Sequence, residues 1–243
     1  MNDVWLFLIV MILSGLVLLA PPTSAWANDR EEAAQIVEKA CMTVDNFMND
    51  KNMEAFKDLL KKAKAVVVAP SLLKGAFVVG VSGGNAVAMI RDEKTDKLSE
   101  PAFYTIGGAS YGLQIGGESS EVILLAMTDR GANALLANSI KLGVDAGIAA
   151  GPIGVGAQAA SANLSADILS FSRSQGLYGG VSLDGAVVAV RESLNQAFYN
   201  NHRISPTDIL VRNSVKNPRT TCLVEGLTKI AKLNETRKFI SVK

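Results

Sequence analysis

Two serines in this 243-residue chain lie in segments that match Gly-x-Ser-x-Gly, a pattern that holds the nucleophile in some hydrolases. The segments are centred on Ser82 and Ser110. His202 is the one histidine of the chain and would act as the base, with Asp167 or Asp184 orienting it. A nucleophile elbow needs a helix after the serine, whereas more strand-like sequence follows each serine here. A serine hydrolase therefore ranks third among the functions considered, and we expect no enzyme and no catalytic residue.

The other cofactor motifs fail for similar reasons. Zinc needs three or four ligands, and the chain has one histidine and two distant cysteines. Residues 154–159 fit Gly-x-Gly-x-x-Ala, but a dinucleotide site requires a helix there and the following sequence does not favour one. Lys and Arg number 24 against 23 acidic residues, and this balance does not favour a general nucleic-acid binder. We expect no cofactor, no metal and no nucleic-acid partner.

The densest basic cluster of the sequence lies beside apolar residues between positions 57 and 74. Lysines next to leucines suit an anionic membrane surface, where each lysine contributes about 1 kcal/mol. The alternative is a solvated helix face that binds nothing. The predicted lipid-binding residues are Lys57, Lys61, Lys62, Lys64, Leu72, Leu73 and Lys74.

The elements that would position this cluster change in character at residue 65. Apolar residues follow a helical period over 30–48 and 53–64, which predicts helices within 29–64. Residues 65–191 hold short Val- and Ala-rich runs separated by glycines, with a strand stop at Pro70 and a hairpin turn at 82–85. The tail is helical again. We therefore predict an α+β fold, with a Gly-rich, curved antiparallel β-sheet or barrel-like core flanked by N- and C-terminal helices.

The N-terminus has the pattern of an export signal. An apolar run over residues 4–20 is followed by two prolines and by Ala-Trp-Ala at 25–27. This predicts a signal peptide over 1–27 that is cut before Asn28, leaving one domain over 28–243. The first residues contain Asp3 and no lysine or arginine, so an uncleaved anchor is the alternative. Either way we expect an exported protein.

The two cysteines, Cys41 and Cys222, lie in the first and the last predicted helix. Disulfides persist in the oxidising compartments that exported proteins reach, and two cysteines allow one pairing. Two buried free thiols are the alternative. The sequence leaves both open.

Several blocks of the β region resemble the SYLF (Ysc84-like) family, and they occur in the expected order over about residues 55–211. The most specific is Gly-Leu-Tyr-Gly-Gly-Val-Ser-Leu-Asp-Gly at 176–185. The others lie at 64–70, 75–80, 84–87, 101–103, 107–117, 149–154 and 168–172, with Asn195, Tyr199 and Ile209-Leu210 after them.

The resemblance implies a non-enzymatic lipid-binding protein, because eukaryotic members bind phosphoinositides, and some also bind actin. A signal peptide before such a domain suggests a bacterial protein of the periplasm or cell envelope. The expected partner is therefore anionic phospholipid or a membrane surface, and actin is not expected. The alternative is an envelope structural or protein-interaction module that binds another envelope protein and no lipid.

Overall fold

A computed structural model describes residues 23–76, 79–111, 116–152, 165–174, 177–179 and 183–232. The helices are α2 (Thr23–Asn49), η2 (Lys51–Met53), α3 (Glu54–Lys62), α4 (Asp129–Ala134), α5 (Glu192–Tyr199), α6 (Pro206–Leu210), η4 (Pro218–Thr220) and α7 (Thr221–Lys232). The strands are β1 (Ala65–Ala76), β2 (Val79–Ile90), β3 (Ala102–Tyr111), β4 (Gly116–Ala126), β5 (Ser139–Lys141), β6 (Ile148–Ala150), β7 (Ile168–Ser174), β8 (Leu177–Gly179) and β9 (Val187–Val190).

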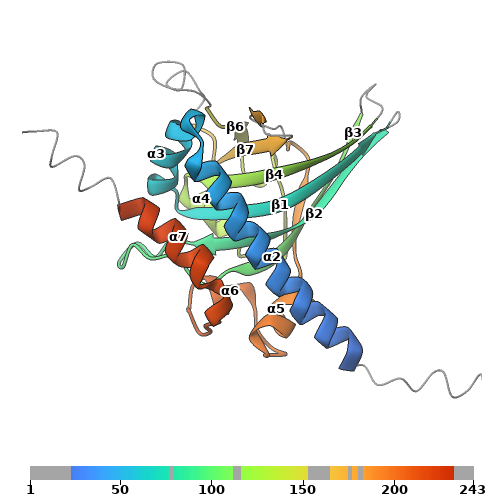
Figure 1. Ribbon diagram of the computed structural model, residues 1–243, viewed down its shortest axis with the longest axis vertical. Helices are drawn as coiled ribbons and strands as arrows, with labels where there is room; N and C mark the ends of the chain where they lie inside the picture. The colour runs from blue at the N-terminus through green and yellow to red at the C-terminus, as the bar shows by residue number, and fades with distance from the viewer. Residues whose placement is uncertain are drawn as a thin grey trace, which may run out of the picture.

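The strands form one curled sheet that makes a half-barrel (Figure 1). Its order is β5-β9-β3-β2-β1-β4-β7-β6, and β8 also pairs with β7. The long strands β1 and β2 occupy the centre, with β3 and β4 on either side. All pairings are antiparallel except that of β6 with β7. The predicted α+β class with a curved, barrel-like sheet is confirmed, and the sheet is mixed because of this one parallel pair.

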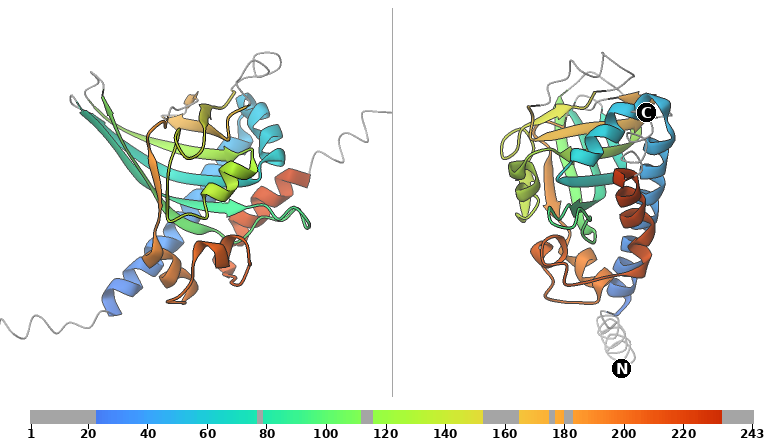
Figure 2. Two further views of the ribbon diagram at one scale, coloured as in Figure 1. Left: turned by 180° about the vertical axis from the view of Figure 1, so that it is seen from behind. Right: turned by 90° about the vertical axis from the view of Figure 1, so that its left-hand side faces the viewer.

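Each face of the sheet has its own apolar core, because successive side chains of a strand point to opposite faces. On one face, Val66 and Val68 of β1 pack under α2, α3, α5 and α7. On the other face, Val67 and Leu72 pack with residues of α4 and α6. Figure 1 shows α2 and α7 crossing the first face, and Figure 2 shows α4 and α6 on the second.

The strand boundaries differ from those predicted at two places. β1 continues through Pro70, and its register with β4 shifts between Ala69 and Leu72. Such an irregularity tolerates proline, which has no N–H to give to the ladder. Residues 82–85 do not form the predicted turn, because they lie inside β2. Glycine is compatible with both turns and strands, so it did not locate the turn.

Gly84 is needed where it stands, because β1 and β2 come close together at the register shift. A Cβ atom on Gly84 would lie 2.2 Å from the carbonyl oxygen of Ser71. Only glycine leaves room for this approach of two backbones.

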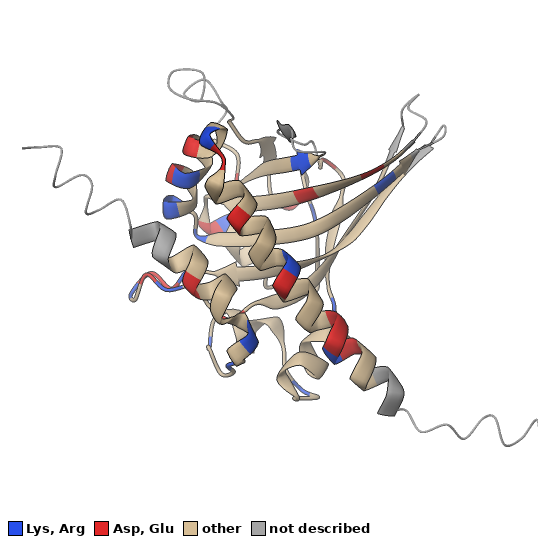
Figure 3. Cartoon of the chain, viewed as in Figure 1, with Lys and Arg blue, Asp and Glu red and all other residues tan. Residues whose placement is uncertain are grey.

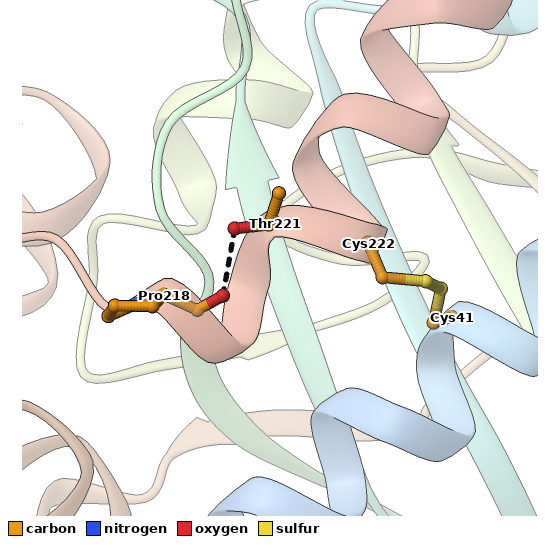
Figure 4. Close-up of a disulfide and its surroundings, with 4 residues drawn as sticks. All are labelled: Cys41, Pro218, Thr221 and Cys222. Carbon is orange, nitrogen blue, oxygen red and sulfur yellow. Dashed lines mark hydrogen bonds between the residues drawn. A yellow bond between two sulfur atoms is a disulfide. The ribbon is translucent and has the colours of Figure 1, made fainter.

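Helix α7 is fixed to α2 by a disulfide between Cys41 and Cys222 (Figure 4). Leu223 and Leu227 of α7 are fully buried in the same core as α2. At the start of the helix, the Thr221 hydroxyl donates to the Pro218 carbonyl at 2.8 Å. The structure thus has the disulfide rather than the two free thiols.

Helix α2 begins at Thr23, so it runs across the predicted cleavage point before Asn28. Residues 1–22 lie outside the described part of the chain, and the signal peptide and the domain limits stay predictions. Among the helices described, none is both long and apolar enough to cross a membrane.

Candidate lipid-binding surface

The predicted lipid-binding residues do not form one surface. Lys57, Lys61 and Lys62 lie on α3, at one end of the sheet. Leu73 and Lys74 lie near the far end of β1, where the strands extend to the opposite side of the molecule (Figures 1 and 3). These residues are close together in the sequence, but the length of β1 separates them in space.

The lysines of α3 are largely occupied within the protein. Lys57 donates to the Asp50 carbonyl at 3.2 Å, and Lys61 pairs with Asp58 at 2.7 Å. Lys62 is exposed, and acidic residues of the same helix lie among the lysines, as Figure 3 shows. Because Lys61 is paired with Asp58 and Glu54 also lies on this helix, α3 carries less net positive charge than its lysines alone suggest.

Lys64, directly after α3, is held by two carboxylates. Its ammonium donates to Asp129 and to Glu93, at 2.9 Å in the second case. These hydrogen bonds raise the pKa of the Lys64 ammonium. The side chain joins the turn after β2 to the start of α4, which is a structural role.

Leu72 is fully buried in the core shared with α4 and α6. The hypothesis that Leu72 contacts acyl chains does not agree with this position. The register shift in β1 turns Leu72 inward and leaves Leu73 on the other face.

The strongest apolar exposure in this region lies at what we call the flared end. It comprises residues 73–76 of β1, 79–83 of β2, 107–111 of β3 and 116–119 of β4, and in Figures 1 and 2 these strand ends extend past the helices. Leu73 is 60% exposed and Val81 is 62% exposed. Val81 was not among the residues predicted from the sequence.

Strand pairing explains why these two side chains are uncovered. Leu73 lies opposite Gly83, and Val81 lies opposite Gly75. On the other side of Val81 the partner is Ala109. Glycine offers no side chain to cover its neighbour, so both apolar groups stay in solvent.

Both residues lie on the sheet face that carries α2. In β2 the residues alternate regularly, so Val81 shares its face with Asn85 and Val87. The Asn85 side chain donates to Glu32 of α2 at 2.8 Å, and Val87 belongs to the core under that helix. The exposed apolar surface therefore lies on the same face of the sheet as the core under α2, beyond the part that the helix covers.

The reverse face of the flared end is polar. Lys74 lies directly opposite Glu118 in the pairing of β1 with β4, and opposite Ser82 in β2. A lysine and a glutamate directly across from each other favour one another. Lys74 and Leu73 thus lie on opposite faces of the sheet. The charge of Lys74 and the apolar side chain of Leu73 do not belong to one surface.

The hydrolase residues are not assembled. Ser82 lies within β2, where its hydroxyl donates to the Gly108 carbonyl at 3.4 Å, and Ser110 lies within β3. The His202 ring contacts Trp26, with 4.3 Å between ring centroids. The Asp167 carboxylate accepts a hydrogen bond from the Thr128 hydroxyl at 2.6 Å, and this bond lowers the pKa of Asp167. Thr128 is the N-cap of α4, so the contact has a structural role.

Other predicted motifs give no further site. Residues 154–159, which fit the dinucleotide pattern, lie outside the described residues. In the part of the chain that the structure describes, no three His, Cys, Asp or Glu residues gather in a way that could hold a metal ion.

The fold is an α+β half-barrel with an exposed apolar patch at one end of its sheet. Residues 107–230 match the family model Ysc84, described as "Las17-binding protein actin regulator". The chain belongs to this family, whose members are binding and regulatory domains. The match confirms the resemblance seen in the sequence.

Several relatives are similar over much of the chain. SH3 domain-containing YSC84-like protein 1 of Rattus norvegicus is 28% identical over 218 residues, which are 89% of this chain and 63% of that protein. The Homo sapiens protein of that name is 29% identical over 181 residues, or 74% of this chain and 52% of the relative. LAS seventeen-binding protein 3 of Saccharomyces cerevisiae is 30% identical over 149 residues, 60% of this chain and 32% of the relative. The chain thus spans less than two thirds of each relative.

These names correct one expectation. Actin was not expected as a partner, because the sequence suggested an exported bacterial protein. The matching family is described as an actin regulator, and the yeast relative is named for binding LAS seventeen. The exclusion of actin was wrong, since it rested on a cell location for which the comparisons offer no support.

Proposed function

We propose that this protein is a non-enzymatic lipid-binding protein that engages membranes through the apolar face of its flared end. The observation that carries the proposal is the exposure of Leu73 and Val81 on neighbouring strands, opposite glycines. Export to a cell envelope remains part of the proposal, because the apolar N-terminal run is typical of a signal.

The proposed contact is mainly apolar. Complete burial of a valine or leucine side chain contributes about 1.5–3 kcal/mol, and two such residues give weak, reversible attachment. Lys74 lies on the other face opposite Glu118, and Lys61 and Lys64 are paired elsewhere. Binding should therefore depend little on salt and little on anionic lipid.

Liposome flotation of residues 23–243, which contain every described element, tests this proposal. The double variant Leu73→Ser/Val81→Ser should lose most of the bound fraction on neutral and on anionic vesicles. The matched control is Met42→Ser/Val144→Ser, because these residues are 61% and 63% exposed outside the flared end. This control should bind like the unaltered protein.

Two results would count against the proposal. Equal losses in both double variants would mean that the flared end is not the contact surface. Binding that disappears at high salt, or in Lys62→Glu alone, would return the site to α3.

A second candidate is binding to actin or to an actin-regulating protein, which the family description favours. Cosedimentation with filamentous actin tests it directly. If the protein pellets with filaments but does not float with vesicles, this candidate replaces lipid binding. The Leu73→Ser/Val81→Ser variant would then show whether the flared end takes part.

A further inference from the structure

A cleft of about 1000 Å³ lies on the body of the protein, away from the flared end. One wall is the turn that joins β2 to β3, over residues 92–100. The other wall is formed by residues 213–218 and the first two turns of α7. Figures 1 and 2 show this turn beside α7. A cleft of this size accommodates a short peptide segment.

Glu100 lies in this cleft as a half-buried carboxylate. One of its oxygens accepts from the Thr220 hydroxyl at 2.7 Å, and Thr220 is itself buried. Among the described residues, Glu100 forms no ion pair with lysine or arginine. A half-buried charge is costly unless it meets a cation or further donors.

The titration of Glu100 agrees with this placement. Burial raises the pKa of the Glu100 carboxyl, although hydrogen bonds from Thr220 and from the backbone of Asn217, and the charge of Lys216, act in the opposite direction. These contacts lower the pKa by less than burial raises it. A cation placed beside the carboxylate would lower the pKa further and offset the effect of burial.

Apolar residues line the same cleft. Val215 and Val224 are half-buried there, and Leu98, which also lines it, is buried in the core. Val224 packs against the core under α2, and Val215 packs against the core on the other face of the sheet. A carboxylate beside an aliphatic wall matches an arginine or lysine side chain, whose stem is apolar and whose head is cationic.

The cleft is also held in shape before any ligand arrives. The Asn217 side chain donates to the Phe198 carbonyl at 3.0 Å and accepts from the backbone of Arg219 at 3.1 Å. The disulfide from Cys222 to Cys41 fixes α7 as one wall (Figure 4). A rigid wall lowers the entropy cost of binding.

We propose that this cleft binds a peptide segment of a partner protein through one arginine or lysine side chain, with its cationic head at Glu100 and its stem along Val215 and Val224. The site is independent of the lipid-binding surface proposed above, since it shares no residue with the flared end.

Fluorescence anisotropy with the full chain in a mild nonionic detergent tests this inference. The probe is a fluorescein-labelled pentapeptide, Gly-Leu-Arg-Leu-Gly, and its counterpart carries uncharged citrulline in place of arginine. The arginine probe should bind at least about tenfold more tightly than the citrulline probe, as expected for a partly buried charge pair. The Glu100→Gln variant should lose this preference.

The matched control is Glu225→Gln, which removes a carboxylate from the exposed rim of the same cleft. It should change affinity by less than about threefold, because exposed charge pairs contribute little. Lys216→Glu replaces a rim cation at an exposed position and should tighten binding of the arginine probe. The Lys216→Glu variant tests the inference if the Glu100→Gln variant fails to fold.

The inference is overturned by any of three results. The first is equal affinity for the two probes. The second is an unchanged preference in folded Glu100→Gln, or an equal loss in Glu225→Gln. The third is no anisotropy change up to about 1 mM protein, a range in which even weak peptide sites are detected.

Discussion

The same four strands have opposite surroundings at their two ends. Under α2 and α3, every side chain of β1 over residues 65–69 is buried on one face or the other. At the flared end, Leu73 and Val81 lie opposite glycines and stay exposed. The body buries apolar side chains on both faces of the sheet, whereas the flared end leaves two of them in solvent.

The contrast comes from side-chain volume. In the body, the Phe56 ring packs at a steep angle against Phe47 and Phe171, with ring centroids 5.4 and 5.1 Å apart. At the flared end, glycine stands at Gly75 and Gly83, opposite the two large apolar residues. Aromatic rings fill the body, whereas glycines leave few side-chain contacts between β1 and β2 on the apolar face of the flared end.

The largest effect should follow from removing an aromatic ring from the body. Phe56→Ala leaves a cavity between Phe47 and Phe171 and should cost about 3–5 kcal/mol of unfolding free energy. Leu73→Ser at the flared end should cost less than about 0.5 kcal/mol, because the side chain is already exposed. Urea unfolding followed by circular dichroism measures both. Similar losses in the two variants would remove the distinction between the regions.

A smaller effect should separate two glycines of the same sheet. Gly84→Ala forces a Cβ against the Ser71 carbonyl and should cost about 1–3 kcal/mol. Gly75→Ala meets nothing within 4 Å and should be neutral within about 0.5 kcal/mol. Thermal unfolding of both variants provides the measurement. A destabilised Gly75→Ala would show that the flared end needs its backbone freedom.

The smallest effect concerns a polar cap of the body. Asp208 at the start of α6 accepts from the Ser205 hydroxyl and backbone and from Arg212, and these contacts lower its pKa to about 2. The unfolded value is about 3.9, so the ionised group stabilises the fold above about pH 4 and this contribution is lost as pH falls toward 2. Asp208→Asn should cost about 1 kcal/mol at pH 7.

The measurement for Asp208 is urea unfolding of both proteins between pH 7 and pH 2. The difference between them should shrink as the pH falls from about 4, where the carboxyl of the unfolded chain becomes protonated, to about 2, where the folded carboxyl does. A difference that stays constant over this range would assign the effect to packing rather than to charge.

The sequence predicted the elements best where the pattern is local. The helices predicted within 29–64 are present as α2 and α3, because a helical period of apolar residues is a local signal. The turn predicted at 82–85 was wrong, because these residues lie within β2. Glycine permits both turn and strand, so only pairing with distant strands settles the choice.

The candidate surface was less predictable for the same reason. Lysine spacing along the chain suggested one cluster, but β1 carries Lys74 far from α3. Whether Leu73 or Leu72 is exposed depends on an irregularity in β1 that only its pairing with β2 and β4 reveals. The exposure of Val81 depends on Gly75 as its neighbour across the strands.

The disulfide between Cys41 and Cys222 also has a mechanical meaning. The two cysteines are 181 positions apart in the sequence, and the nine strands of the described residues lie between them. Tension applied upstream of the first cysteine and downstream of the second would pass through the sulfur atoms and bypass the sheet. A chain held at one end and pulled at the other would therefore keep its half-barrel out of the line of load until that covalent bond is reduced.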